Sequence, residues 1–102
     1  MNLRELLTRD FGTDFPISGG SGSKDSPIVI HRVTPNDYTA VEYGVLQCLG
    51  IGRGIEWKLV QQSLISCNDR SMDQIKIETV KETDTEIITQ IENFYFDITE
   101  CI

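Results

Sequence analysis

The second half of the chain alternates apolar and polar residues with a period of two, which predicts β-strands. The pattern covers three segments separated by short polar turns: 55–59, 74–80 and 86–99. The first segment is ambiguous at its end, because Trp57, Val60 and Leu64 also fit one face of a helix. Strands that follow each other through short turns favour antiparallel pairing. The sequence therefore predicts a meander, in which residues 55–66 form either a strand or a helix.

The first half of the chain predicts one further strand and the main helix. β-Branched residues dominate 28–33, as expected for a strand. Apolar residues then recur at helical spacing through 38–49, after Thr34 and Pro35, which favour a helix start. Gly50 predicts the end of this helix, because glycine commonly follows the last helical turn.

A short helix and a long loop precede these elements. Leu3, Leu6 and Leu7 share one helical face. Residues 10–26 are rich in Gly, Ser and Asp, which predicts a flexible loop within the domain. The predicted order is α-β-α-β-β-β. It corresponds to an α+β fold in which a mostly antiparallel sheet of about four strands packs on one main helix, with a short N-terminal helix.

Size and composition are those of an ordinary globular protein. The chain has 102 residues, of which 39% are hydrophobic and 25% charged, and residues 1–102 are expected to form a single domain. No apolar run approaches the roughly 20 residues that a membrane span needs. The charged start of the chain does not resemble a secretory signal. We expect a cytoplasmic protein that does not associate with membranes.

The charge balance is strongly acidic. Sixteen Asp and Glu residues face nine Lys and Arg residues, which gives a formal net charge of −7. Such a surface repels the phosphate backbone, so we expect no nucleic-acid partner. Acidic side chains alternate with apolar ones in the predicted strands, as on a solvated sheet face. A basic protein partner would suit this surface electrostatically.

The cysteines predict neither a disulfide nor a metal site. Cys48, Cys67 and Cys101 are odd in number and widely spaced, which indicates reduced thiols in a cytosolic protein. Together with His31 they offer four potential zinc ligands. Zinc sites normally include a short C-x₂-C pair, which is absent here, so we expect no metal.

Two glycine-rich segments suggest phosphate binding, but neither has the required pattern. In "GGSGSKDS", Asp25 follows Lys24 where a P-loop needs Ser or Thr, and a strand follows where a helix is needed. In "GIGRG", Arg53 follows a predicted helix C-terminus, whose partial negative charge repels anions. We therefore expect no cofactor. A loop around Lys24 that closes on a ligand or partner remains an alternative.

Catalytic signatures are also absent from the sequence. His31 is the only histidine, and neither G-x-S-x-G nor H-E-x-x-H occurs. The sequence therefore favours a non-enzymatic protein-interaction, accessory or immunity-type module. The alternative is a small-molecule-binding domain or a small enzyme, with a cleft between helix and sheet near His31 and Arg53. The candidate ligand- or partner-binding residues are Lys24, His31, Arg53, Trp57 and Tyr95.

The last predicted strand, 86–99, carries apolar residues on both faces. One face has Ile88, Phe94, Phe96 and Ile98, and the other has Ile87, Ile91 and Tyr95. Because one helix covers one face of a small sheet, the second face needs another cover. A homodimer through this C-terminal strand provides one. The alternative is that the N-terminal helix, with its three leucines, covers the second face.

Overall fold

The computed structural model describes residues 3–32 and 37–101, without the side chain of Cys67. Its elements are α1 (Leu3–Phe11), β1 (Ile17–Gly19), β2 (Ile28–Ile30), α2 (Tyr38–Arg53), β3 (Glu56–Cys67), β4 (Arg70–Glu82), β5 (Ile87–Asp97) and the 3₁₀ helix η1 (Thr99–Cys101). The α+β class is confirmed, and so is the antiparallel meander of the last three strands. The predicted helix-start residues Thr34 and Pro35 lie outside the described residues.

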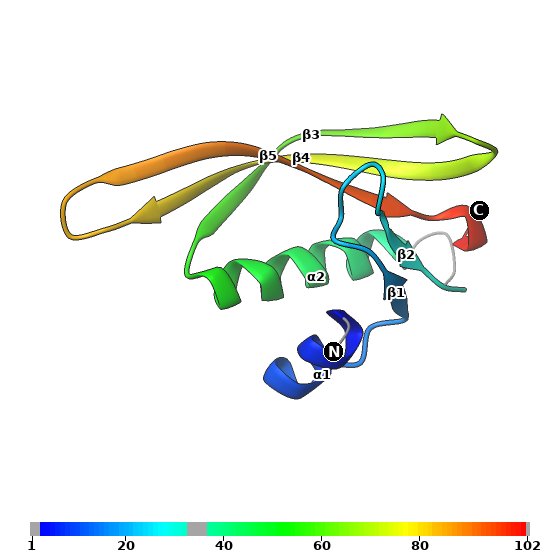
Figure 1. Cartoon of the computed structure of the whole chain (residues 1–102), viewed down its shortest axis with the longest axis horizontal. Coiled ribbons are helices and arrows are strands. Elements are labelled where there is room, and N and C mark those ends of the chain that lie inside the picture. The colour runs from blue at the N-terminus through cyan, green and yellow to red at the C-terminus, as the bar shows by residue number, and fades with distance from the viewer. Residues whose placement is uncertain (1–2, 33–36, 102) are drawn as a thin grey trace.

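The sheet has five strands in the order β1-β2-β5-β4-β3 (Figure 1). Neighbouring strands are antiparallel except β2 and β5, which are parallel, so the sheet is mixed. The prediction of about four strands missed β1, which lies inside the segment 10–26 that was predicted to be a loop. A strand of three residues is too short to display an alternating pattern.

Both helices lie on one side of the long β3–β4–β5 hairpins (Figure 1). α2 runs along the sheet, and α1 contacts β1. The core between these layers contains Leu7, Ile17, Ile28, Ile30, Val45, Leu46, Ile75, Ile77, Phe96, Ile98 and Cys101. No helix of the described residues covers the opposite face of β3–β5. The alternative in which the N-terminal helix covers that face is therefore wrong.

The main helix continues past its predicted end. It runs through Gly50 to Arg53 and is closed by Gly54, whose φ of 67° lies in the left-handed region. Gly50 has a packing role instead, because a Cβ built on it would lie 3.1 Å from Cδ1 of Trp57. The sequence offers three glycines at this helix end, and only tertiary packing distinguishes their roles.

The ambiguous segment 55–66 is a strand. β3 pairs with β4 along its length, and the register shifts once, between Leu59 and Gln61. Asn68 and Asp69 join the two strands with φ values of 51° and 63°. Positive φ at both positions is the mark of a two-residue type I′ turn, which matches the twist of paired strands. Pairing with β4 and this turn favour the strand over the helix.

The C-terminal strand β5 lies inside the sheet. It pairs with β4 from Ile87 to Asp97, and with β2 at its C-terminal end. The N–H of Tyr95 also donates to the carbonyl of Gly22, 2.7 Å away, in the loop between β1 and β2. A homodimer through β5 would therefore have to use its face, where Ile87 and Ile91 are exposed. That dimer stays a prediction, as does the mobility of residues 10–26.

Candidate functional site

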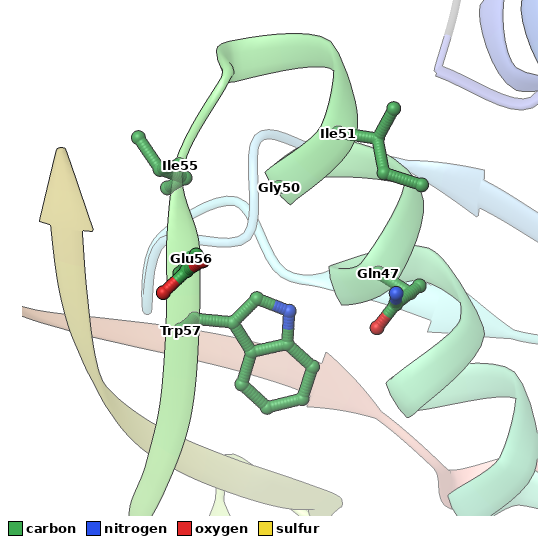
Figure 2. Close-up of a pocket in the computed structure, with 6 residues that line it drawn as sticks. All are labelled: Gln47, Gly50, Ile51, Ile55, Glu56 and Trp57. Carbon is green, nitrogen blue, oxygen red and sulfur yellow. The ribbon is translucent and has the colours of Figure 1, made fainter. Parts of the chain in front are cut away.

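A pocket of about 310 Å³ lies where the last turns of α2 meet the start of β3 (Figure 2). Its lining residues are Gln47, Gly50, Ile51, Ile55, Glu56 and Trp57. β3 directs the half-buried indole of Trp57 toward the helix, and the amide of Gln47 lies across from it. The volume is at the lower end of the range for small-ligand sites, and the lining mixes aromatic, aliphatic and polar groups.

Two contacts hold the indole of Trp57 in place. Gly50 lets the ring edge approach the helix, since any larger residue would crowd it. The ring of Tyr43 lies on α2 with its centroid 6.2 Å from that of Trp57 and its plane tilted by 47°. The Tyr43 hydroxyl donates to Oε1 of Gln62 at 2.7 Å, which ties this aromatic pair to β3. The pocket is therefore built on two rigid elements.

The surroundings of the pocket are electronegative. The C-terminal end of α2 carries a partial negative charge. Glu56 also lines an adjoining pocket of about 210 Å³, together with Gly54, Val80 and Glu82. A cation is therefore favoured here over an anion.

Arg53 does not neutralise this region, because its charge is already engaged. Nη1 and Nη2 of Arg53 donate to the two carboxylate oxygens of Glu92 at 2.8 and 2.9 Å. The hydrogen bond from Arg53 lowers the pKa of Glu92, despite partial burial. The guanidinium of Arg53 thus binds a carboxylate of β5, and its role in ligand or partner binding stays a prediction.

A carboxyl pair is buried deeper between α2 and the sheet. Glu42 and Asp73 are 0% and 3% exposed, and Nε2 of Gln62 donates to Asp73. Burial, and then the neighbouring Asp73, raises the pKa of Glu42 to about 9. A hydrogen bond with Asp73 favours the protonated form of Glu42, because two ionised carboxylates cannot make it. Glu42 is therefore protonated at neutral pH.

Sequence reasoning missed this buried pair, although a signal for it exists. Tyr38, Glu42, Val45 and Leu49 follow one another at helical spacing on the apolar face of α2. A charged residue on such a face is unusual and indicates a raised pKa or a partner. The role of Asp73 has no comparable signal, because its burial follows from β4 lying under α2.

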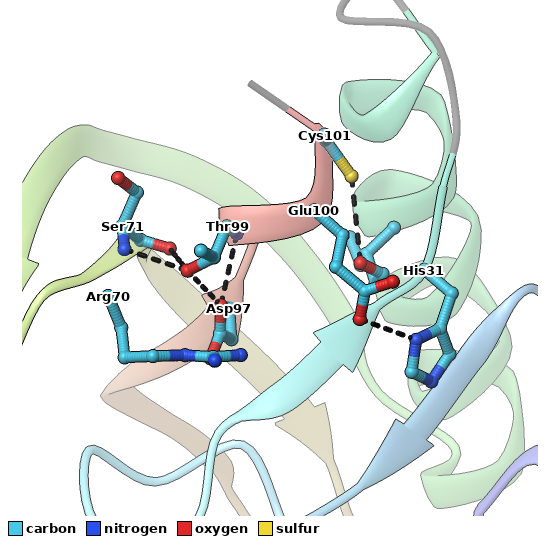
Figure 3. A network of polar contacts seen from close by, with 8 residues as sticks. His31, Arg70, Ser71, Asp97, Thr99, Glu100 and Cys101 are labelled. Atoms are coloured by element: carbon cyan, nitrogen blue, oxygen red, sulfur yellow. Dashed lines mark hydrogen bonds and ion pairs between the residues drawn. The ribbon is translucent and has the colours of Figure 1, made fainter.

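His31 joins two residues that are distant in the sequence, of which Figure 3 shows Glu100. The imidazole follows β2, and its Nε2 lies 2.6 Å from Oγ of Ser18 on β1. Its Nδ1 lies 2.9 Å from Oε2 of Glu100 in η1. No local motif predicts this group, because β1, β2 and η1 meet only in the folded chain. All three residues are at least partly exposed.

A second polar network fixes the C-terminal segment that carries Glu100 (Figure 3). Nε of Arg70 donates to Asp97 at 2.7 Å, and the hydroxyl of Thr99 donates to the same carboxylate at 2.7 Å. The backbone N–H of Ser71 donates to Oγ1 of Thr99. Although burial opposes ionisation, the bonds from Arg70 and Thr99 lower the pKa of Asp97. This network positions η1 and, with it, Glu100.

The five residues singled out from the sequence lie in separate places. Lys24 is exposed in the loop between β1 and β2, and Tyr95 is half-buried on β5. His31 follows β2, whereas Arg53 ends α2, a helix of 16 residues and about 24 Å. Trp57 alone lines the pocket of Figure 2. Neither His31 nor Arg53 lines that pocket, and the cleft predicted near them, like the binding roles of the five residues, stays a prediction.

No family model matches this chain, and neither the curated proteins nor the solved structures include a significant match. Within residues 3–32 and 37–101, no group of three or more His, Cys, Asp or Glu side chains is arranged to hold a metal ion. Neither of the described helices is both long enough and apolar enough to cross a membrane.

Proposed function

We propose that this protein is a non-enzymatic, cytoplasmic interaction module of accessory or immunity type, which binds a cationic side chain of a basic protein partner in the Trp57 pocket. The observation that supports this proposal is the half-buried indole of Trp57 in a preformed pocket that Glu56, its neighbour on β3, also borders. The net charge of −7 would attract a basic partner over longer distances and raise the association rate.

Arginine is the side chain that suits this pocket best. A guanidinium stacks on an indole face and also makes paired hydrogen bonds to a carboxylate. Glu56 and Glu82 supply carboxylates at the border of the two adjoining pockets. The cation–π contact contributes about 0.5–2 kcal/mol, depending on how far water is excluded. An arginine inserted here would act as an anchor, while the rest of the interface excludes water.

Trp57 makes this proposal directly testable, because it is the only tryptophan in the chain. Its fluorescence is titrated with a short arginine-containing peptide and with the same peptide carrying neutral citrulline. We expect saturable quenching or a spectral shift with the arginine peptide alone. Equal responses to both peptides, or no response to either, contradict the proposal.

A matched pair of variants distinguishes the effect of a charge at the pocket from the effect of the net charge of the protein. Glu56→Gln removes a carboxylate at the pocket, and Glu86→Gln removes an exposed one from the β4–β5 turn. Both change the net charge by the same amount. We expect Glu56→Gln to weaken arginine-peptide binding about fivefold or more, and Glu86→Gln to leave it nearly unchanged, since exposed distant charges are screened. Equal weakening indicates attraction by net charge alone.

A second candidate function rests on the group around His31. A hydroxyl, an imidazole and a carboxylate at 2.6 and 2.9 Å have the spacing of a nucleophile, its base and the acid that orients the base. As a small enzyme, the protein would transfer acyl groups through Ser18. A fluorophosphonate probe tests this function. Covalent labelling of Ser18 that is lost in His31→Gln supports the enzyme, and an unlabelled Ser18 excludes this reaction.

A further inference from the structure

The outer edge of β3 has no strand partner among the described residues. β3 is last in the strand order, and its twelve residues form an edge as long as the strand itself (Figure 1). The N–H and C=O groups along such an edge are a template for another strand. Proteins normally block long edges with charges, prolines or bulges.

Only the first half of β3 is blocked in this way. It contains Glu56, Lys58 and the register shift next to Val60. The second half, 61–67, reads QQSLISC and has no charged residue, in a chain whose net charge is −7. It carries Leu64, which is 64% exposed. Two copies of an acidic protein can therefore approach each other here with no like charges in contact.

The turn at the end of β3 shows which backbone groups point outward. In a two-residue hairpin, the residues that flank the turn form a hydrogen-bonded pair, here Cys67 and Arg70. Hydrogen-bonded and non-bonded pairs then alternate along the strands. Gln62, Leu64 and Ser66 consequently direct their N–H and C=O groups away from β4, toward the open edge.

We propose that two copies of this chain pair antiparallel through residues 61–67 of β3, around a two-fold axis beside Leu64. Leu64 then lies opposite Leu64 of the second copy, and Gln62 lies opposite Ser66. The outward groups of these three residues match in this register, so that each copy donates three N–H groups to carbonyls of the other. The interface is isologous and closed, which stops further growth.

Side chains fit the same register. The two Leu64 side chains lie on one face with Cβ atoms about 5 Å apart, and so they bury each other. Because the axis is perpendicular to the sheet, both α2 helices remain on one face. This surface is separate from the Trp57 pocket and from the face of β5.

A cysteine at the axis tests the register. Leu64→Cys brings two thiols to a Cα separation near 5.5 Å, within disulfide range, whereas Val60→Cys leaves them about 26 Å apart. Val60 is similarly exposed and serves as the matched control. Under mild oxidation we expect Leu64→Cys to form a covalent dimer of twice the 11.5 kDa chain mass. Equal cross-linking in Leu64→Cys, Val60→Cys and the unmodified protein overturns the proposal.

Light scattering gives an independent test without new cysteines. At about 100 µM we expect the dimer mass for the unmodified protein and for Val60→Glu, and the monomer mass for Leu64→Glu, which places like charges at the axis. Circular dichroism and the arginine-peptide titration confirm that Leu64→Glu is folded with an intact Trp57 pocket. A mass near 11.5 kDa for the unmodified protein overturns the proposal even if that pocket binds arginine.

Discussion

Strands β3 and β4 are paired along nearly all of β3, yet their apolar side chains differ in exposure to solvent. On β4, Ile75 and Ile77 are almost completely buried under α2. On β3, the neighbouring strand, Leu59 and Leu64 point to the same side of the sheet and are 45% and 64% exposed. The difference lies in position, because β4 has a strand on each side and β3 has one. The apolar side chains of β4 thus stabilise the fold, whereas those of β3 remain accessible to another molecule.

Truncation of core and edge side chains gives the sharpest contrast. We expect Phe96→Ala, which empties a fully buried site next to β4, to lower the free energy of unfolding by about 3–5 kcal/mol. Leu64→Ala is expected to change it by less than about 0.5 kcal/mol in dilute, monomeric protein. Urea denaturation at low protein concentration measures both. Similar losses for the two variants would show that the β3 edge belongs to the core.

The buried side of the sheet also contains the protonated Glu42, whose pKa is raised to about 9. In the unfolded chain this carboxyl ionises near its ordinary value of 4.5, so unfolding between those values releases a proton. The free energy of unfolding is then expected to fall as pH rises from about 5 to 9, by up to about 1.4 kcal/mol per pH unit.

Glu42→Gln isolates this contribution. The variant is expected to lose most of the pH dependence, whereas Glu86→Gln, on the exposed β4–β5 turn, keeps it. Urea denaturation at pH 5, 7 and 9 measures the slopes. A slope that is unchanged in Glu42→Gln would mean that this carboxyl ionises in the folded protein.

Most of the difference between β3 and β4 cannot be predicted from the sequence. Alternation predicted the middle of β4 and the start of β3 but left the rest of β3 ambiguous, and it has the same form on a central strand and on an edge strand. Strand order depends on the parallel pairing of β2 with β5, a contact between segments that local patterns do not connect. The Ser18–His31–Glu100 group depends on that same arrangement. The sequence pointed to the pocket only through Trp57. Gly50 is typical of a helix end, and its packing against the indole depends on the folded structure.

Two glycines at the end of α2 give a smaller test of the same distinction between packed and open positions. A Cβ on Gly50 would crowd Trp57, whereas a Cβ on Gly52 has nothing within 4 Å. We expect Gly50→Ala to destabilise the protein by about 1 kcal/mol and to shift Trp57 fluorescence. Gly52→Ala is expected to stabilise it by about 0.5–1 kcal/mol, because alanine is the better helix former. A stabilising Gly50→Ala would show that the pocket wall is loose.

Amide hydrogen exchange along β3 tests most directly whether its open edge recognises a second copy. The amides of Ser63 and Ile65 bond to β4, so they should exchange slowly at every protein concentration. The amides of Gln62, Leu64 and Ser66 are predicted to exchange slowly at hundreds of micromolar and to become fast on dilution to the monomer. Fast exchange of these three amides at all concentrations would contradict the account.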